Sequence, residues 1–262
     1  MDRAWLREAL LGHAESVRLS VPGARDGDAD AVHDLRVGLR RSRSLLASYA
    51  PLLDCRGLPA EHGELRTWMQ TVGADLGTAR DRDVVHALLL DLLGAGTPLP
   101  DGPQVVAVAV LLDTPALARV LTALPAVAAG VPDIAPEDGW PCARAAWRGL
   151  RRRSRGTGSD AGPDALHRVR KAAKRARYAA DALAPATTGK AAARLGRAAD
   201  LARGVQGALG EHRDTVLLRA WLAAPGGDLD ALASERGTLA LAEYERLRGE
   251  VAPLRLRSRP PG

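Results

Sequence analysis

Residues 32–43 read VHDLRVGLRRSR, and residues 166–177 read LHRVRKAAKRAR. Aligned over an offset of 134 residues, the second stretch matches the histidine and every basic residue of the first. A second pair follows in the same order, because LGTARD at residues 76–81 aligns with LGEHRD at residues 209–214 over an offset of 133. Two pairs of motifs at nearly the same offset indicate that the chain is an internal duplication.

Apolar residues recur at spacings of three and four through both stretches, which is the pattern of an amphipathic helix. The positions expected to face a core are Val32, Leu35, Leu39 and Leu46 in the first repeat and Leu166, Val169, Ala173 and Ala180 in the second. Aromatic residues make up only 3% of the chain, and it has no phenylalanine. Because β-sandwiches and barrels rely on aromatic and β-branched residues in alternating runs, this composition favours an all-α protein.

The chain is predicted to fold as a single domain built from two repeats over residues 1–262. Each half carries about four helical segments with short connections, which predicts a four-helix bundle. We expect residues 1–153 to form the first bundle with a junction helix, residues 154–252 the remainder of the second bundle, and residues 253–262 a flexible basic tail. The two bundles are expected to be related by a pseudo-two-fold axis.

Three features of the sequence predict the cellular compartment. The two cysteines, Cys55 and Cys142, form no CxxC pair and suggest no disulfide framework. The first residues carry charges where a signal peptide needs an apolar core. The longest apolar run, residues 105–112, is too short to span a bilayer. We therefore expect a cytoplasmic protein with no membrane partner.

Each repeat carries a cationic stripe beside its apolar face. On a helix of 100° per residue, each stripe falls within an arc of roughly 80°. The stripes are His33, Arg36, Arg40 and Arg43 in the first repeat and His167, Arg170, Lys174 and Arg177 in the second. Like charges three and four residues apart destabilise a helix, and neither stripe contains carboxylates that would offset them. The counter-charge is therefore expected from elsewhere.

Positive charge is concentrated in one part of the chain. The 37 basic and 31 acidic residues give a net charge of +6 and a pI of about 10.0. Residues 144–177 contain twelve basic residues against two acidic ones, a net of +10, so the rest of the chain sums to −4. A solvated helix face usually mixes both signs, so this excess indicates an anion-binding site. Arginine suits phosphate because its planar fork donates in pairs, and a row at one-turn spacing suits a repeating anion.

The two motifs that begin with Leu-Gly, LGTARD at residues 76–81 and LGEHRD at residues 209–214, are called the LG words. They predict a break or close packing within two long helices. Arg80 and Arg213 lie within these words and are expected to contribute to the same anion site. Asp81 and Asp214 are expected to be structural, either as ion-pair partners of basic side chains or as helix caps. Arg213 either enlarges the anion site or pairs with Glu211.

The chain resembles the CHAD family, the α-helical domain named for its characteristic histidines, over nearly its whole length. The resemblance rests on VHDLRVGLRRSR and ALHRVRKAAKRARY, with LGTARDRDV and LGEHRD behind them. It implies two four-helix bundles, a basic cavity or pore between them, and binding of inorganic polyphosphate. Many members are fused to a CYTH triphosphatase domain with an ExExK signature. The nearest match here, EYERL at residues 243–247, lacks the lysine, so a member without that domain is expected.

The stripes and the resemblance select the same side chains. The candidate polyphosphate-binding residues are His33, Arg36, Arg40, Arg41, Arg43, Arg80, His167, Arg170, Lys171, Lys174, Arg175, Arg177 and Arg213. We expect a non-enzymatic binding module with no catalytic residue, metal or cofactor. Its expected partners are inorganic polyphosphate and enzymes of polyphosphate metabolism, its expected location includes polyphosphate granules, and sulfate or phosphate could occupy the site in crystals.

Two other functions would use the same residues. The His33–Asp34 dipeptide occurs in metal-dependent HD phosphohydrolases, but the neighbouring arginines would repel a divalent cation, and Arg168 replaces the aspartate in the second repeat. Nucleic acid would make the same salt-dependent phosphate contacts. Aromatic residues that could stack on bases are nearly absent from the stripes, Tyr178 being the exception. Nucleic acid is therefore the main alternative partner, and the phosphohydrolase is the less favoured reading.

Overall fold

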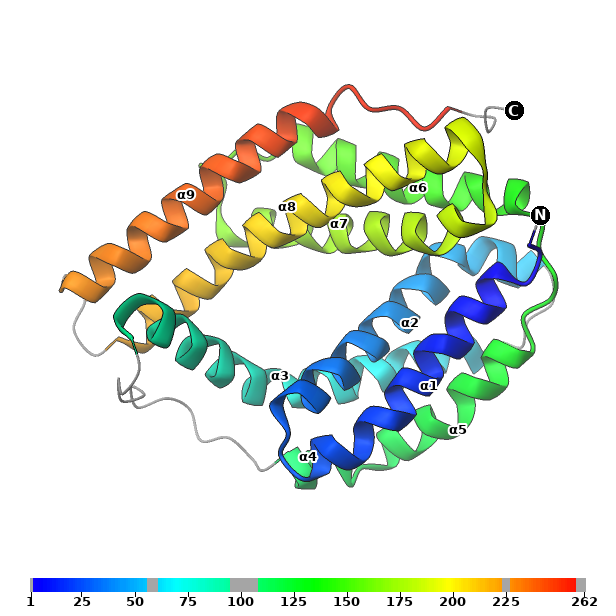
Figure 1. Ribbon diagram of the computed structural model, residues 1–262, viewed down its shortest axis with the longest axis horizontal. Coiled ribbons are helices and arrows are strands. Elements are labelled where there is room, and N and C mark those ends of the chain that lie inside the picture. Colours follow the sequence, from blue (N-terminus) through cyan, green and yellow to red (C-terminus); the bar gives the residue numbers. More distant parts are fainter. Residues whose placement is uncertain (1, 56–60, 95–107, 223–226, 258–262) are drawn as a thin grey trace.

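The fold is helical throughout the described part of the chain, residues 2–55, 61–94, 108–222 and 227–257 of a computed structural model (Figure 1). No strand occurs in these ranges, so the all-α prediction is confirmed. The helices are α1 (Trp5–Arg25), α2 (Ala29–Cys55), α3 (Glu61–Leu93), α4 (Val108–Leu112), α5 (Pro115–Ala129), α6 (Pro136–Arg155), α7 (Pro163–Leu183), the 3-10 turn η1 (Ala184–Ala186), α8 (Gly189–Trp221) and α9 (Asp228–Val251).

Local sequence signals set several of the helix ends. Helices α5, α6 and α7 each begin with a proline at the first helical turn, where the missing N–H has no helical partner to lose. The Thr114 hydroxyl caps α5 by accepting a hydrogen bond from the Leu117 N–H at 3.4 Å. Gly27 lies in the middle of the connection between α1 and α2 with a φ of 84°, a conformation that costs glycine little. The chain can therefore reverse tightly and pack α1 against α2.

The helices pack in two groups (Figure 1). Helices α1, α2, α3 and α5 contact one another in one group, and α6, α7, α8 and α9 do so in the other. The last helix before the predicted boundary at residue 153, α6, packs with the second group. The groups meet mainly where α2 contacts α6 and α7, and again where α3 crosses to α8. The pseudo-two-fold relation between them stays a prediction.

The core has a large part and a small part. All eight positions predicted to face a core are buried, and they belong to one large cluster that includes Trp5, Tyr49, Trp140 and Trp147. A smaller cluster joins the second half of α3 to α8 and α9 through Val85, Leu88, Leu89, Leu218 and Ala233. The two groups are therefore connected in two places, where α2 packs on α6 and α7 and where the second half of α3 reaches α8 and α9.

The start of the predicted flexible tail is held against α6, in contrast to the expectation. The Trp140 indole donates to the Arg257 carbonyl at 2.8 Å, and the Trp147 indole donates to the Leu254 carbonyl at 3.0 Å. Leu256 is buried between these contacts. A tryptophan brings both an apolar ring and a donor, so two of them secure residues 253–257 despite their basic character. Residues 258–262 lie outside the described residues.

Across the described ranges, no helix is both long enough and apolar enough to cross a lipid bilayer.

Candidate anion-binding groove

A groove of about 510 Å³ lies between α2, α3 and α7, and we call it the cationic groove. Its lining residues are Arg40, Arg43, Ser44 and Ala47 from α2, Gly63, Arg66, Thr67 and Gln70 from α3, and His167, Lys171, Lys174, Arg175 and Tyr178 from α7. None of these residues is acidic. The groove thus brings cations of both repeats onto facing walls and adds a third wall from α3.

Two hydrogen bonds link the walls that belong to different repeats. The Arg40 Nε donates to the Tyr178 hydroxyl at 3.1 Å. The buried Tyr49 hydroxyl donates to the Ala179 carbonyl at 2.7 Å, one residue further along α7. Because both bonds join α2 to α7, they hold the two helices at a set rotation, and that rotation decides which side chains face the groove.

Lys174 is the most strongly perturbed cation of the groove. Burial lowers its pKa first, and the charges of Arg170, Arg40, Arg213 and Arg36 lower it further, to about 6. These arginines come from α7, α2 and α8, so one ammonium group experiences positive charge from both repeats. A lysine with this pKa is mostly neutral at pH 7, because protonation would add a further charge to a crowded cationic site.

Other groove cations are perturbed in the same direction. Burial lowers the pKa of Arg43, and the charges of Arg40 and Arg66 add to that effect. Burial also lowers the pKa of Arg175, with added repulsion from Arg153 and Arg66. These arginines nevertheless stay charged at cellular pH, because the guanidinium pKa starts far above it. The groove therefore holds fixed positive charge whose mutual repulsion an anion would relieve.

The histidine of the second repeat lies on the groove wall, whereas that of the first does not. The pKa of His167 is lowered by burial and then by the charges of Lys171, Arg170, Lys174 and Arg213. A neutral imidazole still offers one N–H donor to an anion, so His167 can contribute in either charge state.

Six of the thirteen predicted binding residues line the groove, namely Arg40, Arg43, His167, Lys171, Lys174 and Arg175. The exposed His33 lies near the start of α2, outside this lining. Arg41 faces α1 instead. The pKa of His13 on α1 is lowered to about 4, mainly by burial of its imidazole and further by the charge of Arg41. The side chain of Arg80 lies outside the described residues.

Two equivalent arginines of the repeats pack against the LG words. The Arg36 Nη1 donates to the Leu76 carbonyl on α3. In the second repeat, a Cβ at Gly210 would lie 3.3 Å from a guanidinium nitrogen of Arg170, so the glycine leaves space for that side chain. The predicted close packing is therefore found at Gly210, and both α3 and α8 continue through their LG words without a break.

Two predicted binding residues are already engaged by carboxylates. The Arg177 Nε lies 3.3 Å from an oxygen of Asp181, one helical turn further on. The Arg213 Nη2 lies 2.9 Å from an oxygen of Asp81, and Asp214 is 3.5 Å from its other amine. The expected partner Glu211 instead accepts from Arg236 at 2.8 Å. The interpretation of Asp81 and Asp214 as ion-pair partners is thus confirmed, and both arginines carry a counter-charge of their own.

The groove-facing arc of α7 differs from the predicted stripe. The stripe was placed through residues 167, 170, 174 and 177, whereas the lining runs through 167, 171, 174, 175 and 178. The difference arises because α7 packs against α6, α8 and α2, so its apolar face is wider than the sequence pattern implies. Arg170 and Arg177 consequently lie beside the groove.

Arg66 is a groove residue that the sequence comparison missed. Its Nε is buried and has no hydrogen-bond partner within the described part of the chain. The comparison of repeats passed over it because the position 133 residues later is Ala199. A search for basic residues one turn from other polar residues could have found it, since Gln70 follows at i+4 and lines the same groove.

Metal-binding side chains do not gather around the His33–Asp34 dipeptide. Both residues are exposed at the start of α2. In the described ranges, no three histidine, cysteine, aspartate or glutamate side chains come together as a set of metal ligands. What the cationic groove offers chemically is a set of guanidinium, ammonium, imidazole, amide and hydroxyl donors for anionic oxygen atoms.

The chain matches the CHAD domain family model over residues 8–223. Its fold is similar to that of the CHAD domain from the plant Ricinus communis, with a TM-score of 0.67 and 21% sequence identity, over 99% of this chain and 94% of that chain. PptA from Streptomyces chartreusis also has a similar fold, with a TM-score of 0.52 and 19% identity, over 96% of this chain and 98% of that chain. No curated protein sequence matches the chain.

Proposed function

Because the chain belongs to the CHAD domain family, we propose that it is a non-enzymatic module that binds inorganic polyphosphate in the cationic groove. The observation that carries the proposal is the composition of the groove. Seven basic side chains, counting His167, come from three helices of both repeats, and no carboxylate lies among the lining residues. The family resemblance of the sequence motifs is confirmed by the family match, whereas the ligand is our proposal.

The spread of the cations supports a polymeric anion. From His167 to Arg175 the basic lining extends over nine residues of α7, and the eight steps between them correspond to about 12 Å along the helix axis. Arg40 and Arg43 face it from α2, and Arg66 faces it from α3. A compact anion such as orthophosphate meets only a few of these donors at once. A chain of linked phosphates meets several together, so its affinity should grow with chain length through multivalency.

The electrostatic state of the ligand-free groove supports the same ligand class. The lowered pKa values of Lys174, Arg43 and Arg175 all reflect burial together with repulsion between cations. A polyanion would replace this repulsion with charge-assisted hydrogen bonds. We therefore propose that polyphosphate raises the stability of the folded protein when it binds.

Nucleic acid is the alternative ligand, and the test must distinguish its binding from that of polyphosphate. The Tyr178 ring is only 4% exposed, and its hydroxyl accepts a hydrogen bond from Arg40. Tyr178 is the one aromatic residue among the lining residues, and its burial leaves little face for a base. Phosphate contacts alone favour the ligand with the denser charge, so polyphosphate should bind more tightly than an oligonucleotide of equal charge.

The test is a calorimetric titration at physiological salt with polyphosphates of increasing length and with orthophosphate, sulfate and a single-stranded oligonucleotide. We expect affinity to rise with polyphosphate length and the two small anions to bind weakly. Equal or tighter binding of an oligonucleotide of matched charge would contradict the ligand assignment. Chain length measured after incubation tests the absence of turnover, and release of phosphate would contradict it.

A further inference from the structure

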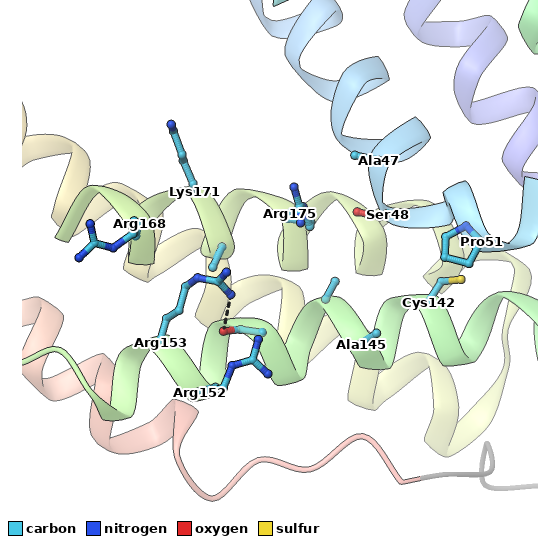
Figure 2. Close-up of a pocket in the computed structure, with 13 residues that line it drawn as sticks. Ala47, Ser48, Pro51, Cys142, Ala145, Arg152, Arg153, Arg168, Lys171 and Arg175 are labelled. Atoms are coloured by element: carbon cyan, nitrogen blue, oxygen red, sulfur yellow. Dashed lines mark hydrogen bonds between the residues drawn. The ribbon is translucent and has the colours of Figure 1, made fainter. Parts of the chain in front are cut away.

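A second cationic pocket adjoins the cationic groove along α7, and we call it the outer pocket. It has a volume of about 450 Å³ and lies between α2, α6 and α7. Its basic lining residues are Arg152 and Arg153 from α6 and Arg168, Lys171 and Arg175 from α7. Figure 2 shows Arg153 reaching from α6 toward α7, where Arg168, Lys171 and Arg175 follow one another along the helix. None of the lining residues is acidic.

The cations of the outer pocket differ from the ion-paired arginines of the surface. The Arg153 Nη1 donates to the Gly149 carbonyl of its own helix at 3.3 Å (Figure 2). Within the described residues, none of the five basic side chains forms an ion pair with a carboxylate. Several exposed arginines elsewhere do so, as Arg203 pairs with Asp200 at 2.5 Å and Arg18 pairs with Glu15 at 2.6 Å. The outer pocket is therefore a second concentration of uncompensated charge.

The outer pocket and the cationic groove share residues. Lys171 and Arg175 of α7 line both, as does Ala47 of α2, so the two hollows are neighbours along these helices. The pKa of Arg175 records both neighbours, since it is lowered by burial and then by Arg153 of the outer pocket and Arg66 of the groove. Arg168, Lys171 and Arg175 are spaced at i, i+3 and i+7, so they form a row along α7 next to the groove-facing arc.

We propose that one polyphosphate chain can continue from the cationic groove along α7 into the outer pocket, which serves as a subsite for long chains. This proposal rests on the proposed function of the groove. Two separate polyanions would repel each other where they meet Lys171 and Arg175. In a single polymer the phosphates are already held together by covalent bonds despite this repulsion. Binding of one chain across both hollows is therefore favoured over binding of a separate anion in each.

The geometry predicts a length threshold. A chain confined to the groove contacts its walls alone, whereas a chain that reaches the outer pocket must also extend past the shared residues Lys171 and Arg175. Short polyphosphate therefore gains nothing from Arg152, Arg153 or Arg168. Long polyphosphate gains their contacts at high effective concentration, because its first segment is already held in the groove.

The test compares two triple variants of the full chain. The first, Arg152→Ala/Arg153→Ala/Arg168→Ala, removes the basic residues that line the outer pocket alone. The matched control, Arg82→Ala/Arg148→Ala/Arg155→Ala, removes the same charge from exposed positions outside the linings of both pockets. All six side chains are exposed, so both variants should fold, and thermal unfolding checks that they do.

Each variant is titrated with tripolyphosphate and with long-chain polyphosphate. We expect the outer-pocket variant to lose about tenfold in affinity for the long chain and to match the wild type for tripolyphosphate, while the control changes either affinity by less than about twofold. Equal losses in both triple variants, or a second tripolyphosphate bound independently in the outer pocket, would overturn the proposal. If the wild type binds neither chain, the function proposed for the groove is itself wrong.

Discussion

The cationic groove and the surface of α9 contain the same kind of side chain in opposite electrostatic environments. On α9, Arg246 binds Glu243 at 2.7 Å and Glu250 at 2.5 Å, and Arg248 binds Glu245 at 2.6 Å. The hydrogen bonds and charge of Glu243 raise the pKa of Arg246, with a further contribution from Glu250. In the groove, burial and neighbouring cations lower the pKa of Arg43 and Arg175.

If the proposed function holds, pairing with carboxylates, rather than the number of arginines, distinguishes the anion-binding groove from the rest of the surface. An arginine that already has a carboxylate must exchange one anion for another when a ligand arrives, so little free energy is gained. An arginine surrounded by other cations gains a counter-charge that it lacks. The net charge of +6 describes neither region, because it averages a paired surface with an unpaired groove.

The largest expected effect is on polyphosphate affinity, and it appears when two arginines are removed from the groove but not when two are removed from α9. Arg43→Ala/Arg175→Ala should weaken polyphosphate binding by about 100-fold, since each charge-assisted contact contributes about 1.5–3 kcal/mol. Arg246→Ala/Arg248→Ala removes the same charge from α9 and should change the affinity by less than about twofold. Calorimetry at one salt concentration measures both, and similar losses in the two variants would remove the distinction between the regions.

The second prediction concerns the pH dependence of binding, which the groove should show and α9 should not. Lys174 has a pKa of about 6 in the free protein, and bound phosphates should raise it, so binding takes up a proton. Affinity should therefore be highest at low pH. It should fall by up to about tenfold per pH unit as the pH rises from 6 toward the pKa of the complex.

The variant Lys174→Met isolates this contribution, because His167, whose pKa is lowered by burial and neighbouring cations, is a second group that bound phosphates would favour in its protonated form. Titrations from pH 6 to pH 9 in buffers of different ionisation enthalpy report proton uptake directly. Proton uptake that is the same in the wild type and in Lys174→Met would assign the pH dependence to another group.

A smaller effect is expected on the stability of the free protein. The pKa of Lys174 is lower in the folded chain than in the unfolded chain, so the unfolded state binds more protons between about pH 6 and the ordinary lysine pKa. The free energy of unfolding should therefore rise with pH across this range and fall as the pH approaches 6.

Lys174→Met should reduce this slope and stabilise the free protein at pH 7 by about 1–2 kcal/mol, as measured by urea denaturation. The exposed Arg246→Met should leave the unfolding midpoint unchanged. A destabilised Lys174→Met protein would show that packing of the lysine stem outweighs the repulsion at its ammonium group.

The smallest predicted effect separates two tyrosine hydroxyls. Tyr178→Phe removes the acceptor that orients Arg40, so polyphosphate affinity should fall by about two- to threefold. Tyr244→Phe removes a bond of 2.7 Å from the α9 hydroxyl to the Thr157 carbonyl. That variant should lose about 1 kcal/mol of stability with no change in affinity. Equal affinity losses in both would assign the effect to stability rather than to orientation of Arg40.

Much of the fold could be predicted because helix periodicity and internal repetition are local properties of the sequence. The positions Leu35 and Leu39, or Val169 and Ala173, were assigned to the core from spacing alone and are buried. The groove was harder to predict, since Arg177 satisfies the same spacing as Lys174 yet pairs with Asp181. Arg66 has no counterpart in the second repeat, so the duplication could not indicate it.

What the sequence determined by itself is the helical class, the repeated motifs, the family and the supply of cations on two helices, because each can be recognised from the order of residues without knowing which helices touch. What only the tertiary structure decided is which of those cations share a groove. That choice depends on the rotation of α7 against α2, α6 and α8, which turns Lys171 and Arg175 toward the groove and leaves Arg170 beside Gly210. Rotation is decided by packing with distant segments, so no local pattern records it.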